Sequence, residues 1–262
     1  MSLLTEGQRH RLAETLWAAE RDRKAVAKPS DSLFYDVDDA YAVQQINTQR
    51  KLAAGARLVG RKVGITSQAV MDWLKVKEPD FGALLNTMIV DDGGACERAS
   101  LLQARVEGEV AFVLGVGLDD EGVTAVDVVN ATDYVTASIE IIDSRIAEWK
   151  LSLTDTVADN ASSARFVMSS MKTSLTGLDL TLQGCALRKN GRIASTGAGA
   201  ACLGNPVNAV VWLARTLAKA GTPLKKGDVV LSGALCPVVP VEAGDVITLE
   251  VGSIGKCSVR FI

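Results

Sequence analysis

The chain has 262 residues, of which 48% are hydrophobic and 23% charged, and its formal net charge is −3. This globular composition excludes a disordered tail, a collagen and a low-complexity segment. The mild acidity argues against a nucleic-acid partner, and no apolar run is long enough to cross a bilayer. The first residues lack the basic start and long apolar run of a signal peptide, so we expect a cytoplasmic protein that does not bind membranes.

The N-terminal part of the sequence predicts helices followed by one strand. Thr5 and Gln8 have the spacing of a capping box, and apolar residues recur after them at helical intervals. The next elements are expected in this order: a helix over 38–55, a strand over 57–65 and a short helix over 67–74. We therefore expect a mainly helical region over residues 1–75, packed on a β-rich catalytic domain over residues 76–262.

Beyond residue 75, short β-branched runs separated by glycine predict many strands. Asn190-Gly191 is typical of a hairpin turn, and one helix begins at Asn205-Pro206 and ends at Gly221. The expected strands cover residues 87–90, 105–116, 134–142, 165–168, 178–187, 228–231, 246–251 and 258–261. The chain contains no internal repeat, and its pattern predicts an α+β fold.

The histidine and cysteine content restricts the chemistry of any active site. The sequence has one histidine, His10, which argues against a Ser-His-Asp triad, a Cys-His pair and a histidine-rich zinc site. An enzyme of this composition has to use carboxylates, lysine, arginine, hydroxyls, backbone amides or a metal held by oxygen. The five cysteines are widely spaced, which predicts reduced, buried thiols rather than disulfides.

Three glutamates lie in predicted strands. Glu107 and Glu109 are two residues apart and therefore point to the same face, while Gly108 leaves the opposite face open to a close neighbour. Glu140 lies within an otherwise apolar strand, where an isolated carboxylate is unfavourable. One divalent cation such as Mg²⁺ or Mn²⁺ would stabilise all three carboxylates and leave coordination positions for water or a chelating substrate.

Each glutamate also has a structural interpretation that spacing alone does not exclude. Glu107 and Glu109 fit the solvated face of an edge strand, because strands routinely carry one polar face. Arg105 or Arg145 could neutralise Glu140 without any metal.

Lys62 and Asp80 are candidates for proton transfer. Lys62 lies in Gly60-Arg61-Lys62-Val63-Gly64, a glycine-flanked strand that leads to a turn. Its alternative is a surface lysine whose stem covers apolar atoms. Asp80 lies in Glu78-Pro79-Asp80-Phe81-Gly82, which predicts a turn, and turn aspartates usually accept hydrogen bonds from backbone amides.

Two polar segments could bind a substrate carboxylate through amides and hydroxyls. The segment 155–163 predicts a polar loop that contains Ser162, and Leu231-Ser232-Gly233-Ala234-Leu235 follows a predicted strand. We expect Ser162, Ser232 and Gly233 to contact the substrate. Ordinary capping and turn formation is the simpler explanation of both segments.

Taken together, these motifs resemble the hydratase/decarboxylase family of the fumarylacetoacetate hydrolase superfamily over nearly the whole chain. The matching segments are Gly60-Arg61-Lys62-Val63-Gly64, Pro79-Asp80-Phe81-Gly82, Glu107-Gly108-Glu109, 140–145, 155–162 and Leu203-Gly204-Asn205-Pro206. The family often has alanine at the position of Gly108, and glycine preserves the common facing of the two carboxylates.

The resemblance implies a mixed β-sheet roll, a divalent metal at Glu107, Glu109 and Glu140, and catalytic roles for Lys62 and Asp80. It also implies a homo-oligomer, with dimers arranged into a decamer as one possibility. The implied reaction is the hydration of 2-hydroxypenta-2,4-dienoate, or a 5-alkyl homologue, to 4-hydroxy-2-oxopentanoate in aromatic meta-cleavage catabolism. Decarboxylation of 4-oxalocrotonate (2-oxohex-3-enedioate) in the same site is the alternative, and a non-catalytic partner subunit is a second one.

Overall fold

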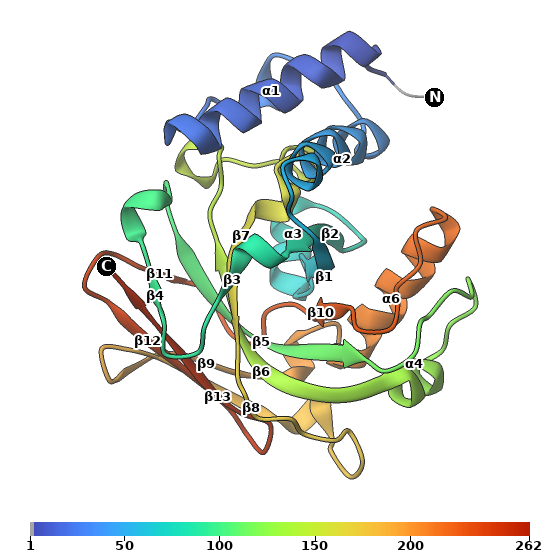
Figure 1. The fold of residues 1–262 in the computed structure, drawn as a ribbon, viewed down its shortest axis with the longest axis vertical. Coiled ribbons are helices and arrows are strands. Elements are labelled where there is room, and N and C mark those ends of the chain that lie inside the picture. The colour runs from blue at the N-terminus through green and yellow to red at the C-terminus, as the bar shows by residue number, and fades with distance from the viewer. Residues whose placement is uncertain (1–2) are drawn as a thin grey trace.

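The computed structural model describes residues 3–262, which form a helical layer and two β-sheets (Figure 1). The α-helices are α1 (Glu6–Asp22), α2 (Val37–Ala53), α3 (Gln68–Leu74), α4 (Ala125–Ala131), α5 (Leu153–Ala158) and α6 (Pro206–Lys219). The larger sheet contains β1 (Leu58–Gly64), β2 (Asp80–Leu85), β3 (Ile89–Val90), β5 (Arg105–Leu114), β6 (Thr132–Ile142), β7 (Ser163–Met168), β10 (Val229–Leu231) and β11 (Val239–Pro240). The smaller sheet contains β4 (Ala95–Cys96), β8 (Gly184–Lys189), β9 (Arg192–Ala198), β12 (Val246–Val251) and β13 (Gly255–Phe261).

The larger sheet is mixed and places distant parts of the chain side by side. Its strand order is β2-β1-β10-β5-β6-β7-β3, with β11 paired to β5. β1 runs parallel to β10, whereas β5 and β6 form a long antiparallel pair. Strands from the beginning, middle and end of the sequence therefore meet at the centre of one sheet.

The smaller sheet packs closely behind β5. A Cβ atom added to Gly108 would lie 2.5 Å from Leu249 Cδ1 and 3.1 Å from Cys185 Sγ. A side chain at this position would require Leu249 to shift, so glycine lets the second sheet approach in its present packing. The expectation that Gly108 faces a close neighbour is confirmed, and the five cysteines are free and buried, as expected.

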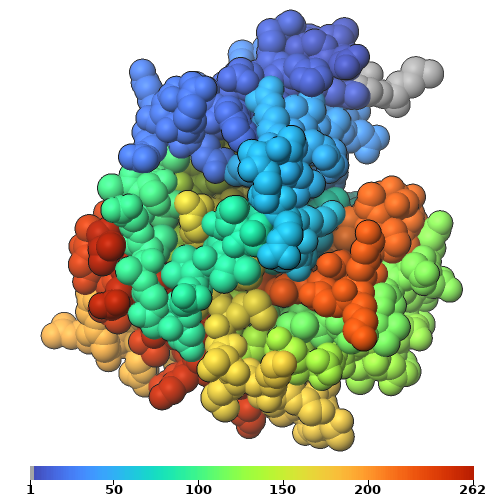
Figure 2. Space-filling model, in the orientation of Figure 1, coloured from blue at the N-terminus to red at the C-terminus, as the bar shows by residue number. Residues whose placement is uncertain are grey.

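Helices α1 and α2 form the layer at the N-terminal end, shown in blue in Figure 2. The capping box at the start of α1 is present, since Thr5 accepts from the backbone N–H of Gln8 and the Gln8 side chain accepts from the N–H of Thr5. Leu12 and Leu16 turn inward from α1 and join an apolar cluster with Val43 of α2. This cluster also includes Val157 of α5, so the helical layer packs on the segment that leads to Ser162.

Most sequence-based elements lie where they were expected. The Asn190-Gly191 turn joins β8 to β9, with φ of 54° and 77° at the two residues, and α6 begins at the Asn205 cap. The α+β fold class is confirmed. The domain boundary at residue 75 stays a prediction; β1, which precedes it, is hydrogen-bonded into the larger sheet. No helix among residues 3–262 is long and apolar enough to span a membrane.

Three local expectations were wrong. The segment around Asp80 is not a turn but the start of β2, because Phe81 and Val63 pair across an antiparallel ladder. The segment expected as a polar loop contains α5, whose N-cap Ser152 forms a capping box with Asp155. Of the strand expected over residues 178–187, only the part from Gly184 onward is extended.

Candidate active site

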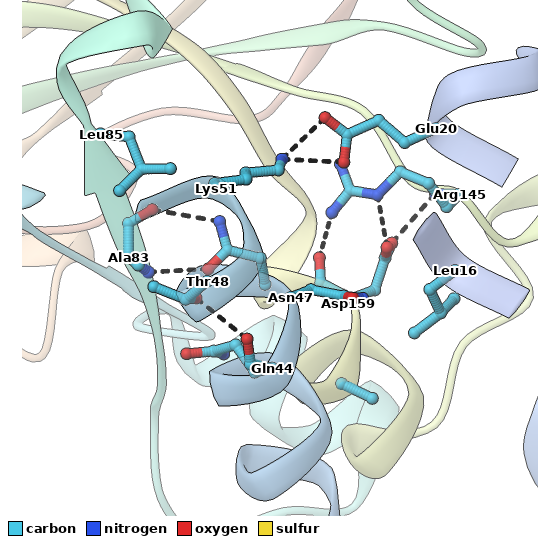
Figure 3. Close-up of a pocket in the computed structure, with 12 residues that line it drawn as sticks. Leu16, Glu20, Gln44, Asn47, Thr48, Lys51, Ala83, Leu85, Arg145 and Asp159 are labelled. Carbon is cyan, nitrogen blue, oxygen red and sulfur yellow. Dashed lines mark hydrogen bonds and ion pairs between the residues drawn. The ribbon is translucent and has the colours of Figure 1, made fainter. Parts of the chain in front are cut away.

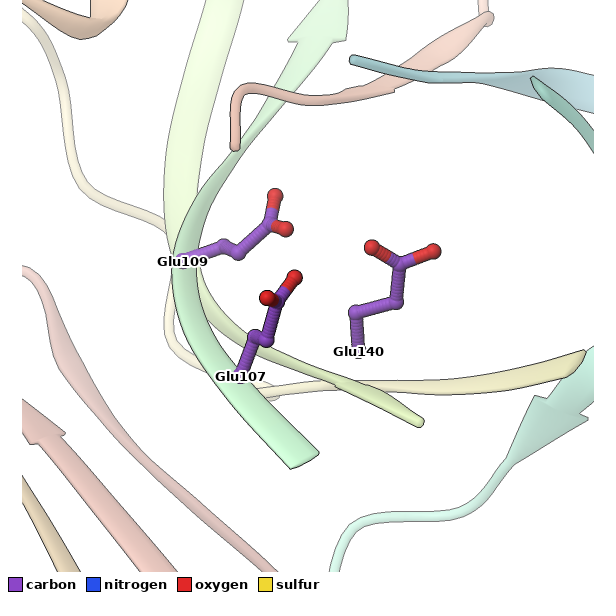
Figure 4. A group of neighbouring side chains, drawn as sticks. All are labelled: Glu107, Glu109 and Glu140. Atoms are coloured by element: carbon purple, nitrogen blue, oxygen red, sulfur yellow. The ribbon is translucent and has the colours of Figure 1, made fainter. Parts of the chain in front are cut away.

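Glu107, Glu109 and Glu140 converge on one point of the larger sheet (Figure 4). Glu107 stands directly opposite Glu140 in the β5–β6 ladder, and Glu109 is opposite Ser138. One carboxylate oxygen from each glutamate lies within 4.8 Å of the others. The predicted common face of Glu107 and Glu109 is therefore confirmed, and strand pairing brings Glu140 to the same face.

Burial makes this cluster electrostatically unfavourable by itself. Glu109 and Glu140 are fully buried, and Glu107 is half-buried. Burial and the neighbouring Glu140 raise the pKa of Glu107 to about 7, and the same two causes raise the pKa of Glu109 well above its ordinary value. Oε1 of Glu109 and Oε1 of Glu140 have no hydrogen-bond partner among the described residues. The oxygen-only donor set, the orphaned atoms and the mutual repulsion all fit a hard divalent cation.

Lys62 provides a positive charge next to the three glutamates. Its Nζ lies 3.3 Å from Glu140 Oε2 and donates a hydrogen bond of 3.1 Å to the carbonyl of Ala161. Burial opposes the charged form of Lys62, but the surrounding carboxylates, Glu140 first, raise its pKa above the ordinary value. The alternative of a surface lysine is wrong, because Lys62 is 3% exposed. Glu140 is thus paired with Lys62 and not with Arg105 or Arg145.

Asp80 lies beside Lys62 because β2 pairs with β1. Gly64 is opposite Asp80 in this ladder, and a Cβ atom at Gly64 would lie 2.2 Å from Asp80 Oδ1 and 3.1 Å from Lys62 Nζ. Glycine therefore leaves the space that the Asp80 carboxylate and the Lys62 ammonium group occupy. Burial raises the pKa of Asp80 to about 6, although Lys62 opposes this shift. A carboxyl group with such a pKa can both hold and release a proton near neutral pH.

A short left-handed segment carries Ser162 into the site. Asn160, Ala161 and Ser162 have φ of 56°, 49° and 57°. The Asn160 side chain fixes this segment to β2, since it accepts from the Ala83 N–H at 2.7 Å and donates to the Ala83 carbonyl at 3.1 Å. The carbonyl of Ala161 consequently faces Lys62, and Ser162 is buried at the edge of the cavity. Asn160 was not identified from the sequence as part of the site, because an asparagine in a polar segment is typical of any turn.

Ser232 and Gly233 lie next to Glu109. The N–H of Gly233 donates a 2.7 Å hydrogen bond to Glu109 Oε2, which fixes the orientation of that carboxylate. Gly233 has φ of 110°, and a Cβ there would lie 2.3 Å from Thr66 Oγ1. Oγ of Ser232 is buried and has no hydrogen-bond partner among residues 3–262. Substrate contact by Ser162, Ser232 and Gly233 stays a prediction.

A cavity of about 180 Å³ opens from these side chains. Lys62, Asp80, Glu107 and Ser162 line its polar part. The rest of the lining is mainly apolar and comprises Gly64, Ile65, Val70, Trp73, Leu74, Arg105, Ile142, Trp149, Leu151, Thr156, Ala161 and Val238. Neither Arg105 nor Trp149 was assigned to substrate binding from the sequence. Arg105 could have been identified from its spacing, because it lies two residues before Glu107 and therefore on the same face of β5.

A second group of charges lies beneath the helical layer (Figure 3), with Arg145 and Asp159 buried and Glu20 and Lys51 partly exposed. Lys51 Nζ lies 2.7 Å from Glu20 Oε1, and the guanidinium of Arg145 forms an ion pair with Asp159. The backbone N–H of Arg145 also donates to Asp159, at 3.0 Å. The cavity between these side chains has a volume of only about 30 Å³. The charges of this group are thus paired with one another, and we call it the closed group.

Comparison with known proteins agrees with the fold. Residues 48–262 match the fumarylacetoacetate (FAA) hydrolase C-terminal family, and the chain belongs to this family. The implied fumarylacetoacetate-hydrolase-like mixed sheet is thereby confirmed.

Similar proteins over the whole chain include hydratases and a decarboxylase. The chain is 48% identical over 259 residues to 2-keto-4-pentenoate hydratase of Paraburkholderia xenovorans (strain LB400), covering 98% of this chain and 96% of the relative. It is 42% identical to 2-hydroxyhexa-2,4-dienoate hydratase of Comamonas testosteroni, over 98% of this chain and 96% of the relative. The structure of 4-oxalocrotonate decarboxylase from Pseudomonas putida G7, complexed with magnesium and adipate, superposes with a TM-score of 0.96 at 37% identity and covers all of both chains.

Proposed function

We propose that this protein is a metal-dependent hydratase that converts 2-hydroxypenta-2,4-dienoate, or a 5-alkyl homologue, to 4-hydroxy-2-oxopentanoate. The observation that carries the proposal is the convergence of three glutamates on one point, with the buried Lys62 and Asp80 lining the same cavity. The hydratases that are 42–48% identical over almost the whole chain support the substrate class.

Glu107, Glu109 and Glu140 would hold Mg²⁺ or Mn²⁺, and Gly233 would orient Glu109 through its N–H. When bound, the cation supplies Lewis-acid stabilisation of negative charge on the C2 oxygen of the substrate. The glutamates themselves would remain ionised, because the positive charge of the cation offsets the burial and the mutual repulsion that raise the pKa of Glu107 and Glu109.

Lys62 and Asp80 would serve the proton transfers. Loss of the 2-hydroxyl proton and protonation at C5 give the unsaturated 2-oxo acid, and the water that then adds at C4 loses a proton while C3 gains one. Lys62 is held by Glu140 and by the Ala161 carbonyl, so its ammonium group has a fixed position at the edge of the cavity. Asp80 is the group whose pKa, raised to about 6 by burial, suits exchange of a proton with water. Ser162, together with Ser232 and Gly233, would bind the substrate carboxylate.

The test uses purified protein, Mg²⁺ or Mn²⁺, and freshly generated dienol, with identification of the product. We expect 4-hydroxy-2-oxopentanoate, no turnover after exhaustive chelation, and recovery when the metal is returned. Full activity after chelation would refute the role of the metal. Absence of product under all metal conditions, with the metal bound, would favour a non-catalytic partner subunit.

Decarboxylation of 4-oxalocrotonate is a second candidate, favoured by the full-length superposition on a decarboxylase structure. Both substrates are offered to one enzyme preparation, and carbon dioxide is measured together with 4-hydroxy-2-oxopentanoate. We expect hydration to dominate. Carbon dioxide as the main product would assign the chain to the decarboxylases and leave the metal site unchanged.

The setting of the reaction is part of the same proposal. We infer a homo-oligomer, for which a decamer is one arrangement, acting in the cytoplasm in aromatic meta-cleavage catabolism. Sedimentation velocity of the purified protein measures the size of the assembly, and a monomer at micromolar concentration would contradict it.

A further inference from the structure

Arg105 is the one arginine among the described residues that lines the cavity of the proposed active site. It lies two residues before Glu107 in β5, on the same face of the strand. Since a strand rises by about 3.4 Å per residue, the two Cα atoms are roughly 7 Å apart. Arg105 thus stands on the side of Glu107 that faces away from Glu109.

Trp149 fixes the position of this guanidinium. The Arg105 Cζ atom lies 4.6 Å from the centroid of the Trp149 ring, within the range of a cation–π contact. The indole is held in turn, because its Nε1 donates a 3.1 Å hydrogen bond to the carbonyl of Gln103. Stacking occupies the face of the guanidinium and leaves the N–H groups at its edge free to bind an anion in a bidentate manner.

No described residue makes a hydrogen bond or ion pair with the Arg105 guanidinium. This distinguishes it from Arg145, which is paired with Asp159. Lys62, the other cation of the cavity, is held by Glu140. The remaining lining around Arg105 is largely apolar, so a second carboxylate entering this cavity would find a cation only at Arg105.

We propose that Arg105, stacked on Trp149, is a specificity-determining residue that binds a second carboxylate at the end of the ligand remote from the glutamates. The site would then accept six-carbon dicarboxylic 2-oxo acids in addition to the five-carbon monocarboxylate. This inference rests on the proposed function, because it assumes that the first carboxylate lies at the glutamate cluster.

The experiment compares two probes of equal length, adipate and hexanoate, which differ by one carboxylate. Their dissociation constants are measured by calorimetry on the magnesium-loaded protein. We expect wild type to bind adipate about tenfold more tightly than hexanoate, the usual size of a charge-assisted hydrogen bond to arginine. In Arg105→Gln the two constants should agree within about twofold, while that of hexanoate changes little.

Two further variants control this comparison. Arg188→Gln removes an arginine that pairs with Glu250 in the smaller sheet, and it should keep the wild-type ratio. Arg105→Lys keeps the charge but loses the planar fork, so it should give an intermediate ratio and remains informative if Arg105→Gln fails to fold.

Adipate binding no tighter than hexanoate in wild type would overturn the inference. So would an equal loss for both probes in Arg105→Gln, because Arg105 would then serve the carboxylate that both probes share. Failure of the proposed function is seen separately, as absence of 4-hydroxy-2-oxopentanoate from the dienol, and does not alter the adipate-to-hexanoate ratio.

Discussion

The molecule contains two groups of charged side chains that are built in opposite ways. In the group beneath the helical layer, Glu20 is paired with Lys51 and Asp159 with Arg145 (Figure 3). In the glutamate cluster, three carboxylates share a single lysine, and two of their oxygens lack any partner among the described residues (Figure 4). In the first group each charge is neutralised by a protein side chain, whereas the second group needs a bound cation to neutralise its excess negative charge.

This difference separates a structural use of buried charge from a functional one. Breaking a closed pair leaves one ion uncompensated, so the expected consequence is a loss of stability. Removing one member of the open cluster relieves repulsion, so the expected consequence is a loss of activity without a loss of stability. Each prediction below tests one side of this contrast.

The largest effect is expected for Glu107→Gln. Loss of one carboxylate ligand weakens the metal site, and we expect turnover of the dienol to fall by about 10⁴-fold, equivalent to about 5.5 kcal/mol. The metal-free variant should unfold in urea at no lower concentration than metal-free wild type. The matched control is Glu20→Gln, which should retain turnover and lose at most about 1 kcal/mol of stability, because its side chain is 42% exposed. A Glu107→Gln protein that is destabilised yet active would reverse the assignment of the two groups.

Arg145→Met should produce the largest loss of stability. It leaves the buried Asp159 without its cation, and we expect the free energy of unfolding to fall by about 3–5 kcal/mol. The double variant with Asp159→Asn should recover part of this loss, because it removes the uncompensated charge. Urea titration followed by circular dichroism measures both. An unchanged midpoint in Arg145→Met would show that this pair does not support the fold.

Lys62→Ala should act on the chemical step. If Lys62 transfers a proton in the transition state, kcat falls by about 10²- to 10³-fold while KM changes little. Lys51→Ala removes a partly exposed lysine that is paired with Glu20, and as the control it should leave kcat unchanged. A rise in KM with kcat preserved would make Lys62 a binding residue.

The smallest effect is the response of stability to Mg²⁺. At a concentration 100 times its dissociation constant, Mg²⁺ should stabilise wild type by about 2.7 kcal/mol, seen as a rise in melting temperature. Glu107→Gln should show a much smaller rise, and Glu20→Gln the wild-type rise. Equal shifts in all three proteins would place the ion elsewhere.

The sequence predicted the glutamate cluster better than its surroundings. Alternation along a strand is a local rule, so Glu107 and Glu109 could be assigned to one face without a structure. Glu140 stood out because a carboxylate in an apolar strand needs a partner. The alternative of a solvated edge strand was wrong, since β5 is paired on both sides.

Other parts of the site depend on contacts that no local rule contains. Asp80 resembled a turn residue because Pro79 and Gly82 flank it, yet pairing with β1 extends the segment into a strand. Asn160 fixes β2 across a long sequence separation, and Arg105 is held by Trp149 from another segment. Such partners are decided by tertiary packing, which the amino-acid pattern of each segment does not encode.

The strand pairing of the larger sheet also has a consequence for how the protein folds. Glu107 and Glu140 lie in strands that follow one another in the sheet and pair directly, so this half of the site depends on contacts of moderate sequence separation. Lys62 lies in β1, whose parallel partner β10 is near the end of the chain. Contacts between such distant segments form slowly, because the chain loses much entropy in closing the loop between them. During synthesis on the ribosome, the lysine half of the site therefore has to wait until almost the whole chain has emerged.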